Sequence, residues 1–310
     1  MKKIGLVVLF VLFNSVLILS LFRINYVLRN KDYSGAQDLF KHWNPEHADI
    51  VFIGNSHQFC SINPDILFDE YGIESFMLAT SAQTVPESYY ATLEAIEEKH
   101  PDKIVFEISY VANDFITVSP EMDHCFFDGM PLNKIKRQAI NDLIAKDDRV
   151  YYWLPIGLYH VRWKDIKPED FDKLSLSKRG NYTKTEVFAN WEIPLVGRNE
   201  VLAMPVKMEE YYKRIIEACK ENEIELIVYV APFNGQYNDD DSKEGLLNRE
   251  KIFNYAVNLA EEKGVKAVNL FYELDELNLD PNNDWGDSQH LNENGKAKLT
   301  RYMVEKGYFE

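Results

Sequence analysis

Two short motifs near the ends of this 310-residue chain contain the residue types of an acyl-transfer site. Gly54-Asn55-Ser56-His57 directly follows an apolar run, and Asp287-Ser288-Gln289-His290 lies about twenty residues before the carboxyl end. A serine hydroxyl becomes a nucleophile when a base lies within hydrogen-bond reach, and an aspartate can fix the orientation and tautomer of a histidine base. Ser56, His290 and Asp287 therefore predict chemistry through an acyl-serine, provided that the fold brings them together.

Each motif also has a simpler interpretation. Gly-x-Ser after an apolar run is often only a turn, and Asp287 with His290 is compatible with a capping carboxylate beside a surface imidazole. Of the seven histidines, however, only His290 has an aspartate three residues before it. Ser56 ends the first predicted strand and the second motif precedes the last predicted helix, so both loops should open at the carboxyl edge of a parallel sheet, where reactive groups collect.

The elements that must position these residues follow from the pattern of apolar residues. Strands are expected at 49–53, 74–78, 103–108, 224–230 and 265–270. Helices are expected between Asn63-Pro64 and Gly72, and at 86–100, 208–222, 246–263 and 293–306. Such an alternation predicts an α/β fold with three layers, in which helices cover both faces of a parallel sheet.

The stretch from 115 to 205 does not continue this alternation. It is rich in aromatic residues and lysine; five prolines interrupt it, and a sixth, Pro205, ends it. We interpret it as a mainly non-sheet insertion at the carboxyl edge of the sheet, where it would be a lid or a substrate platform. A structural subdomain without contact to ligand is the alternative.

The amino-terminal segment is of a different kind. Ile4 to Phe22 is 19 residues without a charge, and as a helix it would span about 28 Å, close to the thickness of a bilayer core. A cleaved signal peptide is the alternative, but the run is long and no small-x-small cleavage site follows it. The sequence thus predicts a single-pass anchor at 1–24, a lead-in at 25–47 and a domain at 48–310. Because the leading end is short, the domain is expected outside the cytoplasm.

The composition excludes some partners. The chain has 34 basic and 50 acidic residues and a formal net charge of −16. This surplus opposes a sequence-independent grip on nucleic acid and adhesion to anionic lipid. Cys60, Cys125 and Cys219 lack the spacing of a disulfide framework or of a metal site, so we expect buried thiols and no bound metal.

Together the two motifs resemble those of the SGNH (GDSL-like) hydrolase family, over roughly Ala48 to the carboxyl end apart from the insertion. Gly54-Asn55-Ser56 is similar to the first block, with Asn55 where many members have Asp. The motif at 287–290, followed by Leu291-Asn292 and Gly295, is similar to the last block. The resemblance implies Ser56 as nucleophile, His290 as base, Asp287 as its partner, a three-layer α/β/α fold and no cofactor.

The middle blocks depart from the family pattern. The segment Leu78 to Gln83 is similar to that of membrane-anchored members of bacterial envelope systems, which implies an oxyanion site lined by Ser81, Ala82 and Gln83. The third block is reduced to Ala112-Asn113-Asp114, so Asn113 is the remaining candidate donor. His57 and His160 are either substrate contacts or ordinary polar neighbours.

These observations lead to one principal hypothesis and two alternatives. The chain is expected to be a membrane-tethered serine esterase or O-acyltransferase acting on O-acyl groups, such as acetyl, of a cell-envelope polysaccharide. The resemblance also implies that the protein acts together with a membrane-bound O-acyltransferase. The alternatives are D-alanyl transfer to teichoic acid and a non-catalytic scaffold or glycan-binding subunit of an acylation complex.

Overall fold

The five predicted strands form one sheet. The computed structural model of the chain describes residues 2–29, 40, 48–171, 179–188, 200–232 and 243–309. Every strand bound lies within one residue of its predicted position, and all four neighbouring pairs are parallel. The strands are β1 (Ile50–Gly54), β2 (Ser75–Ala79), β3 (Lys103–Glu107), β4 (Glu225–Val230) and β5 (Lys266–Asn269). The predicted α/β class with a parallel sheet is confirmed.

The strand order, β2-β1-β3-β4-β5, places β1 between β2 and β3. The chain leaves β1 toward one edge of the sheet and later returns to its other side, so β1 and β3 flank the point where the strand order reverses. Gly54 at the end of β1 is level with Ala79 of β2, and Ile53 is level with Phe106 of β3. The loops that follow these three strands therefore emerge side by side.

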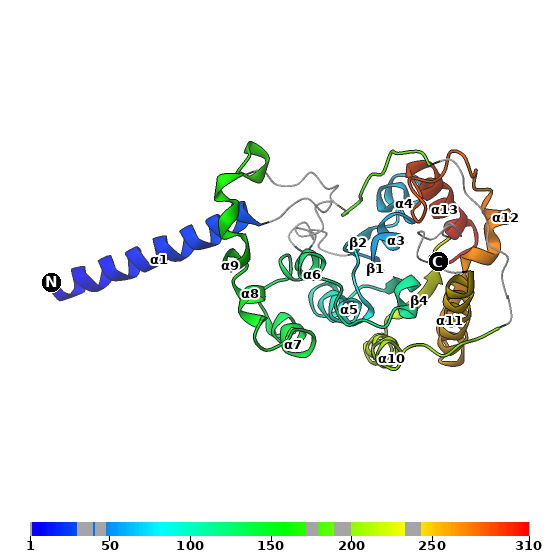
Figure 1. The fold of residues 1–310 in the computed structure, drawn as a ribbon, viewed down its shortest axis with the longest axis horizontal. Helices are drawn as coiled ribbons and strands as arrows, with labels where there is room; N and C mark the ends of the chain where they lie inside the picture. The colour runs from blue at the N-terminus through cyan, green and yellow to red at the C-terminus, as the bar shows by residue number, and fades with distance from the viewer. Residues whose placement is uncertain are drawn as a thin grey trace.

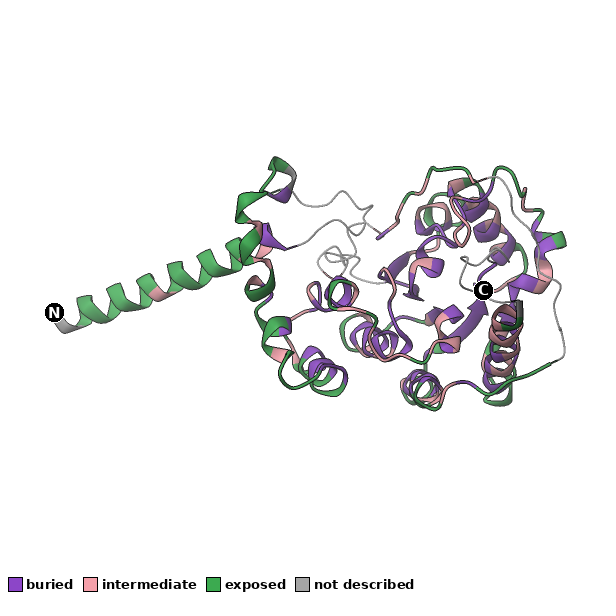
Figure 2. Cartoon of the chain, in the orientation of Figure 1, coloured by how far each residue is buried: buried purple, intermediate pink, exposed green. Residues whose placement is uncertain are grey.

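Helices cover both faces of the sheet, as predicted (Figure 1). On one face α4 (Pro64–Tyr71) contacts α13 (Glu293–Glu305), and on the other α5 (Val85–Lys99) packs along α10 (Val206–Glu221). The α11 helix (Lys243–Glu262) contacts β4 and β5. Two short elements, η5 (Leu270–Glu273) and α12 (Leu274–Leu277), join β5 to the loop that carries the second motif. The strands are almost entirely buried between these layers (Figure 2).

The bounds of α4 follow from local chemistry. The Asn63 side chain accepts hydrogen bonds from the backbone N–H groups of Asp65 and Ile66, which have no acceptor within the helix. Pro64 occupies the first helical turn, where its missing N–H is not needed. Gly72 ends the helix with φ of 72°, a left-handed conformation that a residue with a Cβ rarely adopts.

The described residues of the insertion contain helices and no strand, and they divide into two parts. The first part packs against α5 through α7 and against the amino-terminal helix through α9, η3 and η4. The second part, residues 179–188, runs from β2 to α13 along the sheet: Met77 N–H donates to the Arg179 carbonyl and Glu293 N–H to the Lys184 carbonyl. Residues 172–178 and 189–199 of the insertion lie outside the described residues. The elements of the first part are α6 (Pro120–Phe127), α7 (Lys134–Leu143), α8 (Arg149–Trp153), α9 (Ile156–Tyr159), η3 (His160–Lys164) and η4 (Pro168–Phe171).

The amino-terminal helix α1 (Lys2–Leu28) projects from the domain, and its apolar side chains are exposed (Figure 2). It is long and apolar enough to cross a membrane, with a mean hydropathy of 2.7 over its best window. The helix continues four residues past the predicted anchor end at 24, because its last turn, including Val27 and Leu28, is buried against the insertion. Most of the predicted lead-in, 30–39 and 41–47, lies outside the described residues.

Candidate active site

Ser56 is the one residue between Ile50 and Pro64 that is not buried. It begins the single-turn helix α3 (Ser56–Phe59), and the preceding Asn55 caps that helix by accepting a 2.7 Å hydrogen bond from the His57 N–H. Gly54 has φ of 153°, and a Cβ there would lie 2.9 Å from the Gln58 Cβ. The glycine therefore allows the sharp turn that lifts the Ser56 hydroxyl from the sheet toward the surface.

The loop carrying the second motif is held from both ends. Gly286 N–H donates to the His290 carbonyl at 2.9 Å, and Trp285 forms an antiparallel bridge with Leu291. Asn292 then caps α13 by accepting from the N–H groups of Asn294 and Gly295. The turn between these contacts brings the Asp287 carboxylate and the His290 ring onto the same side of the loop.

The structure brings Ser56 and His290 together across 234 positions of sequence. The Ser56 Oγ lies 2.8 Å from His290 Nε2, and Asp287 Oδ2 lies 2.9 Å from His290 Nδ1. An ionised carboxylate only accepts hydrogen bonds, so Nδ1 carries the proton and Nε2 is left to accept from the Ser56 hydroxyl. This is the hydrogen-bond order of a nucleophile, a base and an orienting carboxylate.

The Asp287 carboxylate is fixed by several donors. Its Oδ1 accepts from the backbone N–H groups of Gln289 and His290 at 2.7 and 2.8 Å, and its Oδ2 lies 3.0 Å from the Lys184 ammonium. Partial burial acts to raise the pKa of Asp287, but the hydrogen bond and charge of His290, the Gln289 N–H and Lys184 together lower it below the usual range. Asp287 is therefore ionised throughout the neutral pH range.

Because α13 packs closely beneath this loop, we predict that Gly295→Ala lowers both stability and activity. A Cβ at Gly295 would lie 2.3 Å from the Asp284 carbonyl oxygen and 2.9 Å from Leu291 Cδ2, so α13 and the loop would have to separate. We expect a loss of about 2–3 kcal/mol in the free energy of unfolding, measured by urea denaturation in detergent. Esterase activity should fall as well, because Asp287 and His290 shift away from Ser56.

Asn294→Ala is the matched control for this change, since Asn294 is exposed in the same helical turn. It should leave both stability and activity near their wild-type values. Equal stability of the Gly295→Ala and Asn294→Ala proteins would contradict the packing argument.

His57 lies behind the base. It is 2% exposed, and its ring centroid is 5.0 Å from that of His290. Burial and the neighbouring His290 lower the pKa of His57 to about 3, so its ring is uncharged at neutral pH. The sequence left His57 as either a substrate contact or an ordinary polar neighbour, and its buried position fits the second. Its uncharged ring packs beside the His290 ring.

A buried carboxylate ties the strand ends together below Ser56. Glu107, at the end of β3, accepts hydrogen bonds from Ser109 Oγ at 2.8 Å, from Ser109 N–H at 3.0 Å and from the Ala231 N–H at 3.2 Å. Asn55 Nδ2 in turn donates to Ser109 Oγ at 3.2 Å. This network links the loops after β1, β3 and β4 and thereby positions the turn that carries Ser56.

Glu107 also predicts a pH dependence of stability. Burial raises the pKa of Glu107 to about 7, although the bonds from Ser109 and Ala231 oppose the rise. In the unfolded chain the pKa of this side chain is near the ordinary glutamate value of 4.5. The stability that the protonated Glu107 provides is therefore complete below that pH and is lost as pH rises through 7. Glu107→Gln cannot ionise, and we expect it to be more stable than wild type by about 2–3 kcal/mol at pH 8.5.

The measurement is urea denaturation in detergent at pH 5 and pH 8.5. At pH 5 the extra stability of Glu107→Gln over wild type should shrink or vanish, since wild-type Glu107 is then protonated in the folded protein. Glu221→Gln removes an exposed carboxylate and serves as the control. A stability difference between Glu107→Gln and wild type that is the same at both pH values would rule out this titration.

The loop after β2 contains the predicted oxyanion residues. Ser81 is half-buried and Ala82 has φ of 54°, so the loop turns sharply level with the end of β1. The Gln83 side chain accepts from Thr80 N–H and Thr80 Oγ1 at 3.0 Å and donates to Ser88 Oγ at 3.1 Å. Gln83 is thus engaged within its own loop, where it shapes the backbone that carries Ser81.

Asn113 lies in the next loop along the same sheet edge. It follows η2 (Ser109–Ala112), its N–H donates to the Tyr110 carbonyl at 3.1 Å, and its side chain is half-buried. The loops that carry the predicted donors Ser81 and Asn113 therefore follow the two strands that flank β1, the strand before Ser56.

His160 is the one predicted site residue that the fold separates from the others. It is exposed at the start of η3, and its Nδ1 lies 2.8 Å from the Gly157 carbonyl oxygen. Figure 1 shows this part of the chain beside the end of α1, with α5 and α6 between it and α3. Its prediction as a substrate contact does not fit this position. The cause is that η3 packs on α1 and not on the carboxyl edge at β1.

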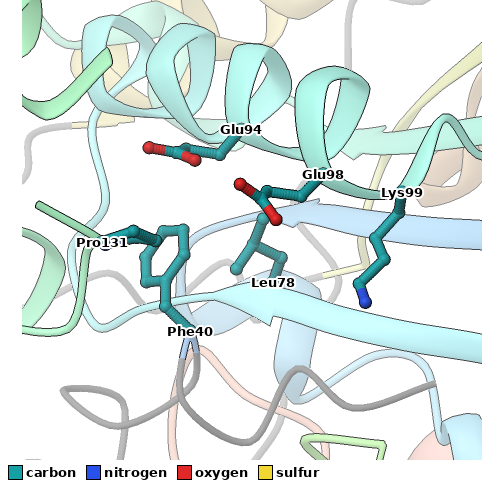
Figure 3. Close-up of a pocket in the computed structure, with 6 residues that line it drawn as sticks. All are labelled: Phe40, Leu78, Glu94, Glu98, Lys99 and Pro131. Carbon is teal, nitrogen blue, oxygen red and sulfur yellow. The ribbon is translucent and has the colours of Figure 1, made fainter. Parts of the chain in front are cut away.

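A pocket of about 170 Å³ lies elsewhere, between α5 and β2 (Figure 3). Burial raises the pKa of Glu94, one of its lining residues, to about 7. None of Ser56, Asp287 and His290 lines it, so it is separate from the candidate active site. The lining residues are Phe40, Leu78, Glu94, Glu98, Lys99 and Pro131.

Sequence reasoning missed two supporting side chains. Glu107 had a readable signal, because a carboxylate at the carboxyl end of an apolar strand is unusual and must find donors there. Lys184 had none: it lies about a hundred residues from Asp287, within a segment without periodicity. Only the path of residues 179–188 across the start of α13 brings the two together.

The fold and the site define an α/β protein with a Ser-His-Asp hydrogen-bond chain at the switch point of its sheet. Comparison of the chain with models of known protein families finds no match, and comparison with curated proteins finds none.

Proposed function

We propose that this chain is a serine-dependent esterase or O-acyltransferase that is held at a membrane by α1. The observation that carries the proposal is the 2.8 Å contact between Ser56 Oγ and His290 Nε2, with the Asp287 carboxylate on the other ring nitrogen. The half-buried Ser56, in a segment that is otherwise buried, gives an acyl donor access to the hydroxyl.

The proposed reaction has two steps. Ser56 Oγ attacks the carbonyl carbon of an ester while its proton moves to His290 Nε2, and Asp287 stabilises the resulting imidazolium. The tetrahedral intermediate then breaks the bond to the leaving oxygen, which takes the proton from His290, and an acyl-serine remains. Water or a glycan hydroxyl attacks this acyl group in the second step, gives its proton to His290 and restores the Ser56 hydroxyl.

The developing oxyanion needs hydrogen-bond donors. The Ser56 N–H lies in the first turn of α3, where a helix offers it no internal acceptor. The loops with Ser81 and Asn113 supply the remaining candidate donors from the two flanking strands.

The substrate class follows from the anchor and from the resemblance to membrane-anchored SGNH proteins. With α1 as an uncleaved anchor, we place the domain outside the cytoplasm, next to O-acylated envelope polysaccharide and to a membrane-bound O-acyltransferase. The aromatic residues of α8, α9 and η3 lie beside α1 and add no support for a sugar platform at Ser56. In the second part of the insertion, Tyr182 does pack on Phe59 of α3, with ring centroids 5.1 Å apart. D-alanyl esters of teichoic acid are an equally suitable acyl chemistry for this site.

The non-catalytic alternative receives less support. A scaffold has no need for a base within hydrogen-bond distance of a serine, a carboxylate held below its usual pKa and a lysine on that carboxylate. These contacts are those that nucleophilic catalysis requires.

Acylation of Ser56 tests the proposal directly. The full chain in detergent is incubated with p-nitrophenyl acetate, quenched in acid and examined by intact mass, followed by peptide mapping. We expect one acetyl group on Ser56 and none on the Ser56→Ala variant. An unmodified wild-type chain, or equal modification of both chains, would refute acyl-serine chemistry.

A further inference from the structure

Exposed apolar side chains are concentrated in one short segment of the insertion. Among the described residues outside α1, more than half of the exposed large hydrophobic side chains lie between 150 and 171. Leu154, Val161 and Trp163 are 62, 56 and 64% exposed. Contiguous exposed apolar surface of this kind marks an interaction site. We call residues 149–171, which include α8, α9, η3 and η4, the juxtamembrane platform (Figure 2).

The juxtamembrane platform is fastened to the end of α1. Arg162 Nη1 donates to the carbonyl oxygens of Leu28, at 2.8 Å, and of Arg29, which satisfies acceptors that the last turn of a helix leaves open. Arg162 is held in place by Asp170 at 3.0 Å, and Arg29 itself donates to the Asp128 carbonyl at 2.9 Å. The platform therefore has a fixed height along α1.

That height coincides with the end of the apolar segment of α1. A groove of about 420 Å³ lies between α1, the start of α7 and the end of α8, and Phe22, the last residue of the uncharged run, forms one wall. A membrane crossed by α1 would bring its hydrocarbon boundary to this groove. The other lining residues are Leu132, Asn133, Lys134, Arg137, Trp153 and Leu154.

The local charge differs from that of the whole chain. Residues 130–171 contain eight Lys or Arg and six Asp or Glu, whereas the full chain has 34 basic and 50 acidic residues. Lys134, Arg137, Lys164 and Lys167 are exposed. The net charge of the chain argued against contact with anionic lipid, but the segment beside the anchor does not share the acidic surplus. Tryptophan, aliphatic and basic side chains together are typical of segments in the headgroup region.

We propose that the juxtamembrane platform lies in the headgroup interface of the membrane, with Leu154, Val161 and Trp163 inserted beside α1. This inference depends on the membrane anchor of the proposed function, and it adds a second contact with lipid. Because the platform also packs through α7 on α5, the contact would hold the catalytic domain at one height and tilt above the bilayer. Because α1 forms one side of the groove and would cross the membrane, lipid is the molecule that we expect in the groove.

Site-directed spin labelling of the full chain in nanodiscs of phosphatidylcholine and phosphatidylglycerol tests the proposal. The three native cysteines are buried, and burial raises the pKa of the Cys60 thiol to about 12, so added cysteines can be labelled selectively. Labels at Leu154→Cys and Val161→Cys are compared with Val206→Cys, an 82% exposed position on α10. Each label's collision rate is measured with oxygen, which enters lipid, and with a water-soluble nickel chelate.

We expect the ratio of oxygen to nickel collisions to be several-fold higher at Leu154→Cys and Val161→Cys than at Val206→Cys. The proposal would be overturned if the ratios at Leu154→Cys and Val161→Cys both equalled the ratio at Val206→Cys. The exposed surface would then be assigned to a protein partner that is absent from the nanodisc. A label at Leu12→Cys, in the middle of α1, reports on the anchor separately. A water-exposed Leu12→Cys label would reject the anchor together with the platform, while acylation of Ser56 would still test the chemistry.

Discussion

Ser56→Ala is expected to lower kcat for p-nitrophenyl acetate hydrolysis by at least about a thousandfold, to the background rate. The hydroxyl is the atom that His290 Nε2 contacts at 2.8 Å, and alanine leaves the base without a nucleophile to activate. Because Ser56 is half-buried at the first position of a single-turn helix, the substitution should leave the fold intact. Steady-state kinetics on the full chain in detergent, with thermal unfolding of the same samples, measures both effects.

The matched control is Ser61→Ala, a buried serine five residues later in the same segment. Its activity should stay within a few-fold of wild type, since it lies outside the contacts of His290. Retention of more than a tenth of wild-type activity by Ser56→Ala would mean that another group attacks the ester.

Asp287→Asn should give the second largest loss, on the order of 10³ to 10⁴-fold in kcat. An amide NH₂ facing Nδ1 favours the tautomer with its proton on Nε2, which can no longer accept the Ser56 proton. The Asn oxygen can still accept from the Gln289 and His290 N–H groups, so the loop should keep its shape. Activity across pH 6–9 with unchanged thermal unfolding would separate loss of the base from loss of the fold.

Lys184→Met is the control for charge at the same carboxylate. It removes the 3.0 Å ion pair with Asp287 but leaves the carboxylate and both backbone donors in place. We expect a reduction of at most about tenfold, since partly exposed ion pairs contribute little. If Lys184→Met lost as much activity as Asp287→Asn, the ammonium and not the histidine tautomer would be the determining feature.

The platform and the proposed chemistry together suggest how the acceptor is selected. The active site lies at the sheet edge above β1, whereas the platform lies at the end of α1, and α5 and α6 lie between them (Figure 1). A domain held at fixed height by two membrane contacts would reach acyl donors at one distance from the bilayer.

The strands and most helix ends were predictable because they depend on local chemistry. Apolar runs such as 50–53 are buried wherever a parallel sheet forms, and Asn63-Pro64 and Gly72 set the ends of α4 through caps that need only neighbouring residues. The prediction of α1 ended at 24, short of Leu28, because burial of the last turn by the insertion is a tertiary effect.

By itself, the sequence determined that a serine follows the first strand, that an Asp/His pair precedes the last helix and that both open at one sheet edge. Only the tertiary structure decided that Ser56 and His290 meet at 2.8 Å, because strand order and the path of each loop are set by packing between distant residues. It likewise brought Lys184 to Asp287 and placed η3, which begins at His160, against α1. Both belong to the insertion, where no periodic pattern fixes which surface a residue contacts.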